Sequence, residues 1–185
     1  MNKDLFWELI RKSSKQAEGD VDYTMDLLRN SLEELEPESI LKFHNIFDEY
    51  HNLSNKMKLW AAAYVINGGC SDDGFDYFRG WLIAQGKSVF MKALENPDSL
   101  AKLDEIDEAE CEYIMSVAGS AYLEKFSDGS ADWDKFYSGI KLNPLTQSEI
   151  DSIHSEIVYG DDMDIEWEEE DLAEIVPELY ERYGF

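Results

Sequence analysis

Residues Leu59 to Phe90 read LWAAAYVINGGCSDDGFDYFRGWLIAQGKSVF, and they predict two buried helices separated by a glycine turn. We expect the first helix to extend from Ser54, as its N-cap, to Ile66. Its second half is apolar on nearly every side, which is typical of a helix in the middle of a bundle. Asn67-Gly68-Gly69 should end it, because glycine readily adopts the left-handed conformation that closes a helix.

The second helix of this segment is predicted to begin at Asp72 or Asp73. Either side chain is a preferred N-cap. Phe75, Phe78 and Leu82 then recur at helical spacing, so they should share one face directed toward the core.

The same periodicity recurs through the rest of the chain, without the alternation that marks a strand. We therefore expect an all-α fold, a compact multi-helix bundle with little or no β-structure. Residues 1–185 should form a single helical domain with residues 59–95 at its centre and an acidic C-terminal loop and helix in residues 161–185. Residues 127–160 are less clearly assigned, and their first half, from Ser127 to Asn143, is predicted to be loosely structured. Further helical stripes lie in Lys3–Glu18, Val21–Leu35, Ile40–Tyr50, Cys111–Ala121 and Leu172–Tyr183.

The charge is strongly one-sided. The chain carries 41 acidic and 16 basic residues, for a net charge of −25. Twelve carboxylates and no basic residue lie between Glu156 and Glu181, and six more carboxylates lie between Asp104 and Glu112. Such a balance disfavours direct contact with nucleic acid or an anionic membrane, and it favours a basic protein as partner.

Both cysteines, Cys70 and Cys111, lie in apolar surroundings without C-x-x-C spacing, so we expect reduced thiols. The N-terminal residues do not resemble a signal peptide, and the longest uncharged apolar stretch, Leu59 to Ile66, is too short to cross a bilayer. These features predict a cytoplasmic protein. The sequence suggests no cofactor.

The turn from Asn67 to Asp76 is the most unusual loop. Asp72, Asp73 and Asp76, with Arg79 one turn further on, are candidate ligand-binding residues beside aromatic side chains. The simpler interpretation is structural, since carboxylates are favoured as caps and in the first turn of a helix.

Two other patterns carry weaker signals. His44, Asp48 and His51 share a helix face and resemble a zinc-binding trio, but no fourth ligand is evident, so we predict a surface cluster and no metal. Gly80 to Ser88 resembles a phosphate-binding loop, but it has five residues between its glycines instead of four and no preceding strand. We interpret that similarity as coincidence.

The segment from Leu59 to Phe90 and the following ENPDSLA resemble the bacterial domain-of-unknown-function 4240 family. The stretch from Asp4 to Ile10, together with Trp167, Glu169–Pro177 and Leu179, is similar to the ends of that family. The resemblance implies a small helical cytoplasmic protein and assigns no activity and no catalytic residues. Residues 127–160 match less clearly.

The leading hypothesis is a non-enzymatic interaction module whose acidic surface binds a basic partner. It could act as an immunity-type inhibitor of a basic toxin or as a mimic of DNA. The alternative is an enzyme or small-ligand-binding protein that uses the Asn67–Asp76 loop. No nucleophile elbow, zinc-protease motif or dinucleotide fingerprint is present, so no catalytic residue is assigned.

Overall fold

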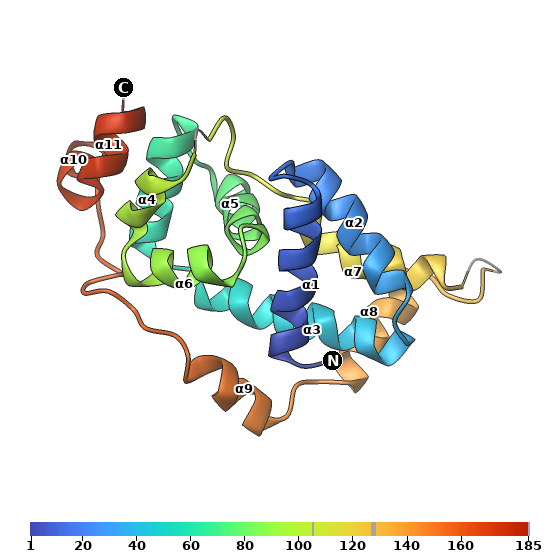
Figure 1. Ribbon diagram of the computed structural model, residues 1–185. Helices are drawn as coiled ribbons and strands as arrows, with labels where there is room; N and C mark the ends of the chain where they lie inside the picture. Colours follow the sequence, from blue (N-terminus) through green and yellow to red (C-terminus); the bar gives the residue numbers. More distant parts are fainter. Residues whose placement is uncertain (105, 127–128, 185) are drawn as a thin grey trace.

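The computed structural model describes residues 1–104, 106–126 and 129–184, and within these ranges the chain is helical and contains no strand. The expected all-α multi-helix fold is thus confirmed (Figure 1). The elements, in chain order, are α1 (Lys3–Gln16), α2 (Val21–Glu33), α3 (Pro37–Leu53), α4 (Met57–Asn67), α5 (Asp72–Ala84), α6 (Lys87–Glu95), the 3-10 helix η1 (Pro97–Lys102), α7 (Ile114–Glu124), α8 (Trp133–Leu142), α9 (Gln147–His154), the 3-10 helix η2 (Glu169–Asp171), α10 (Leu172–Ile175) and α11 (Pro177–Tyr183).

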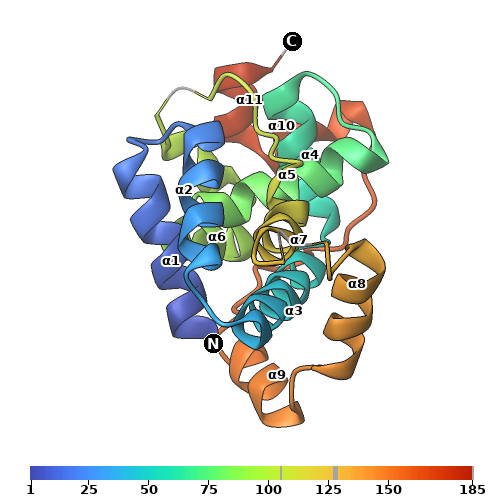
Figure 2. The same cartoon turned by 90° about the vertical axis from the view of Figure 1, so that its right-hand side faces the viewer.

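Helix α5 is the central element of the bundle, since it packs against α1, α2, α3, α4, α6 and α7. Its predicted apolar stripe is buried: Phe75 is 3% exposed, and Phe78 and Leu82 are fully buried. In Figure 2, α3 and α7 run beside one another through the middle of the molecule, with α1 and α2 on one side and α8 on the other.

The glycine turn between α4 and α5 forms as expected, but the cap of α5 differs. Gly68 closes α4 in the left-handed conformation, with φ of 67°. Asp72 or Asp73 was expected to cap α5, which is wrong: the Ser71 side chain accepts the hydrogen bond from the Gly74 N–H, at 3.1 Å. The two aspartates lie in the first turn, where the positive end of the helix dipole favours carboxylates.

Two helix starts also differ from the sequence-based prediction. Ser54 does not begin α4; it terminates α3, and its hydroxyl donates to the His51 carbonyl at 2.9 Å. Cys111 lies before α7 because its N–H donates across to the Tyr77 carbonyl, at 3.0 Å.

The segment predicted to be loose contains a helix. Helix α8 is capped by Asp132, whose side chain accepts from the Lys135 N–H, and it packs on α3 and α7. The part of that prediction that falls on residues 127–128 lies outside the described residues. The capping box of Thr146 and Glu149 then starts α9, as its spacing indicates.

The C-terminal helices α10 and α11 both pack against α4. Pro177 stands at the first position of α11. The buried carboxylate of Asp98 accepts hydrogen bonds from the N–H groups of Glu178 and Leu179, at 2.9 and 2.8 Å. Before reaching α10, the chain passes along the outside of the molecule (Figure 1).

None of the helices in the described ranges has the length and apolar character needed to span a bilayer.

Candidate functional site

Carboxylates from two distant parts of the chain gather around one hollow of about 690 Å³, which we call the acidic groove. One wall is the turn between α1 and α2, the other is the loop between η1 and α7, and Trp81 and Gln85 contribute from the end of α5. No basic side chain is among the described residues that line it. Its seven carboxylates are Glu18, Asp20, Asp22, Asp104, Asp107, Glu108 and Glu110.

The first wall is shaped by a tight turn. Glu18 and Gly19 both have positive φ, of 53° and 90°, and this reverses the chain after α1. Asp20 then caps α2 by accepting a hydrogen bond from the Tyr23 N–H at 2.8 Å. The turn therefore places Glu18, Asp20 and Asp22 at the edge of the acidic groove, and the backbone conformation of the turn fixes their positions.

The second wall is attached to α4 through Asn67, the residue before the glycine turn. Its Oδ1 accepts a hydrogen bond from the Ala109 N–H at 2.9 Å, and its Nδ2 donates to the Ala109 carbonyl at 3.5 Å. Ala109 is fully buried. The amide side chain thus satisfies both backbone groups of a residue that lies between Glu108 and Glu110.

Further hydrogen bonds tie the same loop to the C-terminus. The Tyr183 hydroxyl accepts from the Ile106 N–H at 3.2 Å, and the Arg182 guanidinium donates to the Leu103 carbonyl at 2.6 Å. Gly80 on α5 permits the close approach of the loop end, because a Cβ there would lie 2.7 Å from the Cys111 carbonyl oxygen. The acidic loop is consequently held at several points along its length.

The surroundings of the groove shift the pKa of one of its acidic residues, Glu110. Burial and repulsion from Glu108 raise the pKa of Glu110. Burial and the nearby Glu110 also raise the pKa of the Cys70 thiol, to about 11. Cys111 likewise has its pKa raised to about 11, chiefly by burial. Both free thiols are protonated at neutral pH and are poor nucleophiles.

The four residues predicted to bind a ligand divide into two groups. Asp72 is exposed at the N-terminus of α5. Arg79 is buried, pairs with Asp76 and donates to the His51 carbonyl at 2.8 Å, so it holds α5 against α3. Asp73 and Asp76 line a separate hollow of about 430 Å³. Their role in ligand binding stays a prediction.

That hollow also brings in the histidine trio. His44, Asp48 and His51 all line it, facing Asp73 and Asp76 across the gap between α3 and α5. His44 Nε2 lies 3.3 Å from Asp48, and burial lowers the pKa values of both histidines. No group of three or more histidine, cysteine or acidic side chains within the described residues is arranged to hold a metal ion.

Sequence reasoning singled out one wall of the acidic groove and missed the other. The stretch from Asp104 to Glu112 stood out by its charge density, although Glu105 lies outside the described residues. Glu18, Asp20 and Asp22 did not stand out, because their significance depends on the fold. Part of the acidic C-terminal run is neutralised by ion pairs. Glu156, for example, pairs with both Lys87 and Lys3, at 2.8 and 3.1 Å.

Comparison with known proteins gives one match. A family model described as a protein of unknown function (DUF4240) matches residues 1–124, which include both walls of the acidic groove. The match ends before Trp167, so the expected likeness of the C-terminal stretch stays a prediction. Neither the curated proteins nor the solved structures contain a match.

Proposed function

This chain belongs to the DUF4240 family of unknown function, and we propose that it is a non-enzymatic interaction module whose acidic groove binds an arginine- or lysine-rich segment of a basic partner protein. A single observation carries the proposal. Seven acidic residues line one hollow that no described basic side chain lines.

Gathering these charges has an energetic cost in the free protein. Like charges repel one another, and the raised pKa of Glu110 reflects burial together with that repulsion. A guanidinium or ammonium group in the groove would relieve the repulsion and form charge-assisted hydrogen bonds. The cost in the free state therefore favours the complex.

The walls are also fixed before a partner arrives. Asn67 holds the loop at Ala109, Tyr183 holds it at Ile106, and the cap of Asp20 holds the opposite turn. A preorganised site loses little conformational entropy on binding. A concave surface of one charge sign also focuses the electric field and accelerates the approach of an oppositely charged partner.

The groove suits a short basic segment better than a broad basic surface. A hollow of about 690 Å³ has the size range of small-ligand sites, which is enough for a few extended arginine or lysine side chains. Arginine is the better match, because its planar guanidinium bonds carboxylates in a bidentate manner. Both forms of the hypothesis, an immunity-type inhibitor and a mimic of DNA, require such contacts.

The test is the binding of a fluorescein-labelled peptide of alternating arginine and glycine, followed by fluorescence anisotropy at low and high salt. The groove variant is the double substitution Asp107→Lys and Glu108→Lys. The matched control is Glu174→Lys with Glu181→Lys, which changes the net charge equally at exposed positions of α10 and α11.

We expect the groove variant to bind the peptide roughly tenfold more weakly than the native protein. The control should bind the peptide within about threefold of the native protein, because salt screening limits the range of an electrostatic interaction to about 8 Å. Equal losses in both variants would show that only the overall charge matters. Affinity that does not fall with salt would also contradict the proposal. A natural partner captured at low salt distinguishes the two forms of the hypothesis. If DNA displaces that partner, the result supports the DNA mimic, and if DNA does not displace it, the result supports the inhibitor.

A further inference from the structure

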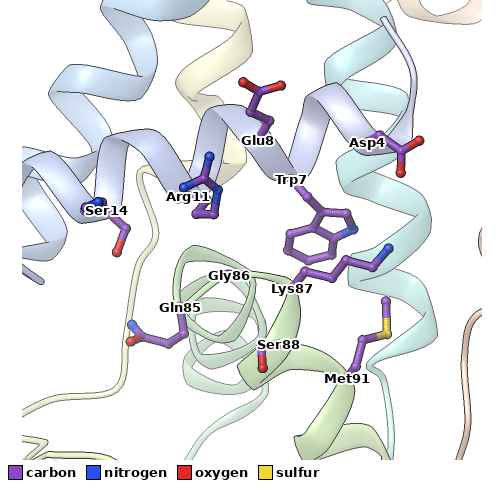
Figure 3. A pocket seen from close by; sticks show the side chains of 11 residues that line it. Asp4, Trp7, Glu8, Arg11, Ser14, Gln85, Gly86, Lys87, Ser88 and Met91 are labelled. Atoms are coloured by element: carbon purple, nitrogen blue, oxygen red, sulfur yellow. The ribbon is translucent and has the colours of Figure 1, made fainter.

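A second, chemically opposite hollow lies between α1 and α6 (Figure 3). It encloses about 760 Å³, within the range of small-molecule sites. We call it the α1–α6 hollow. Its charged lining residues are Asp4 and Glu8 together with Arg11, Lys15 and Lys87, and Trp7 and Met91 supply apolar surface.

The hollow has an apolar wall held in place by aromatic packing. The Trp7 ring extends from α1 toward α6, where Lys87 and Met91 lie opposite it (Figure 3). Its ring centroid lies 4.8 Å from that of Tyr50 and 5.4 Å from that of Phe90. Trp7 is only 4% exposed, and its side chain also interacts with that of Tyr50.

The other wall is the N-terminus of α6. Gly86, with φ of 90°, breaks the chain between α5 and α6, and no side chain caps the new helix. The first N–H groups of a helix have no partner within the helix, and they attract anions together with the positive end of the dipole. Lys87 and Ser88 therefore present backbone donors at the same hollow that Trp7 lines.

The charge of these two helices is opposite to that of the protein. α1 and α6 contain six of the 16 basic residues of the chain and only three acidic ones, although two of the six, Lys3 and Lys87, pair with Glu156. Glu8 in the lining is paired with Lys12 at 2.8 Å. Arg11 and Lys15 form no ion pair or hydrogen bond with any residue that the structure describes.

From these observations we infer that the α1–α6 hollow binds a small molecule with one anionic group and a flat apolar body. The anionic group, a carboxylate, sulfonate or phosphate, lies at the N-terminus of α6 within reach of Arg11. The apolar body lies along Trp7 and Met91. The inference is independent of the acidic groove, which selects ligands of the opposite charge.

The probe is 8-anilinonaphthalene-1-sulfonate, which has a flat aromatic body and one anionic group and fluoresces when it is bound in an apolar site. The uncharged N-phenyl-1-naphthylamine is its matched neutral counterpart. The site variant is Arg11→Gln. The control is Lys92→Gln, which removes one positive charge from an exposed position of α6 outside the hollow.

We expect Arg11→Gln to weaken binding of the sulfonate roughly tenfold, as the loss of one charge-assisted contact predicts, and to leave binding of the neutral probe unchanged. Lys92→Gln should bind both probes within about twofold of the native protein. In amide NMR spectra, the sulfonate should shift the signals of Lys87 and Ser88.

Three results would overturn the inference: no binding of the sulfonate by the native protein, equal affinity for the neutral probe, or equal losses in the two variants. Amide shifts confined to other elements would place the probe on another apolar surface and would overturn it as well. The basic peptide should not displace the sulfonate, so failure of this site and failure of the acidic groove are distinguishable.

Discussion

Replacing Asn67 with alanine should weaken the attachment of the acidic loop to α4. The side chain of Asn67 makes both of its described hydrogen bonds to Ala109, at 2.9 Å through Oδ1 and 3.5 Å through Nδ2. Alanine removes both partners, while the Ala109 backbone stays in a position that water does not reach. The variant therefore tests whether this clamp holds the wall of the groove.

The magnitude follows from the unpaired N–H of Ala109. A buried donor that loses its acceptor destabilises the native state by about 1–3 kcal/mol. Alanine is the better helix former at the last residue of α4, which returns roughly 0.5 kcal/mol. The net loss is about 0.5–2.5 kcal/mol, and for a chain of this size it lowers Tm by roughly 1–10 °C.

Thermal unfolding followed by circular dichroism measures the loss, and amide hydrogen exchange measures its location. Exchange at Ala109 should accelerate more than exchange in α5. Asn30→Ala is the matched control, because Asn30 is exposed on α2, and its substitution should change stability by less than about 0.5 kcal/mol. An Asn67→Ala protein with native Tm and native exchange at Ala109 would refute the clamp.

Three other predictions follow from single contacts. Gly80→Ala should lower the free energy of unfolding by about 1–3 kcal/mol in urea titrations, despite the better helix propensity of alanine, because its Cβ would lie 2.7 Å from the Cys111 carbonyl oxygen; an unchanged midpoint would contradict this. Glu110→Gln should stabilise the protein at neutral pH by up to about 0.5 kcal/mol, because the raised pKa of Glu110 means that folding disfavours its charged form. The native protein regains this difference as the pH falls through that raised pKa, so stability curves of the two proteins should converge in acid and separate at neutral pH. Thr146→Ala removes the capping box and should destabilise α9 by about 1 kcal/mol, seen as faster exchange of the α9 amides with little change in α5.

Features that depend on neighbouring residues were predictable from the sequence. The buried stripe of α5, the left-handed glycine at the end of α4 and the capping box of α9 each depend on residues a few positions apart. The errors in predicting helix ends arose where two neighbouring residues, or two neighbouring helices, suit the same capping position. Ser71 is as good a cap as Asp72 or Asp73, and Ser54 is as suitable for ending α3 as for starting α4.

The candidate sites required the tertiary structure. Charge density identified the stretch from Asp104 to Glu112, but only packing places it opposite Asp20 and Asp22. Likewise, the resemblance of Gly80 to Ser88 to a phosphate-binding loop was interpreted as coincidence, and nothing in that stretch indicates that α1 supplies Arg11 and Trp7 to the same hollow.

The sequence by itself determined the all-α class, the buried face of α5 and the surplus of negative charge, because hydrophobic periodicity and charge are properties of short segments. Only the tertiary structure decided where that charge is concentrated and where it is reversed. Electrostatic interactions depend on distance in space, and the packing of α1 against α2, α3 and α5 determines those distances.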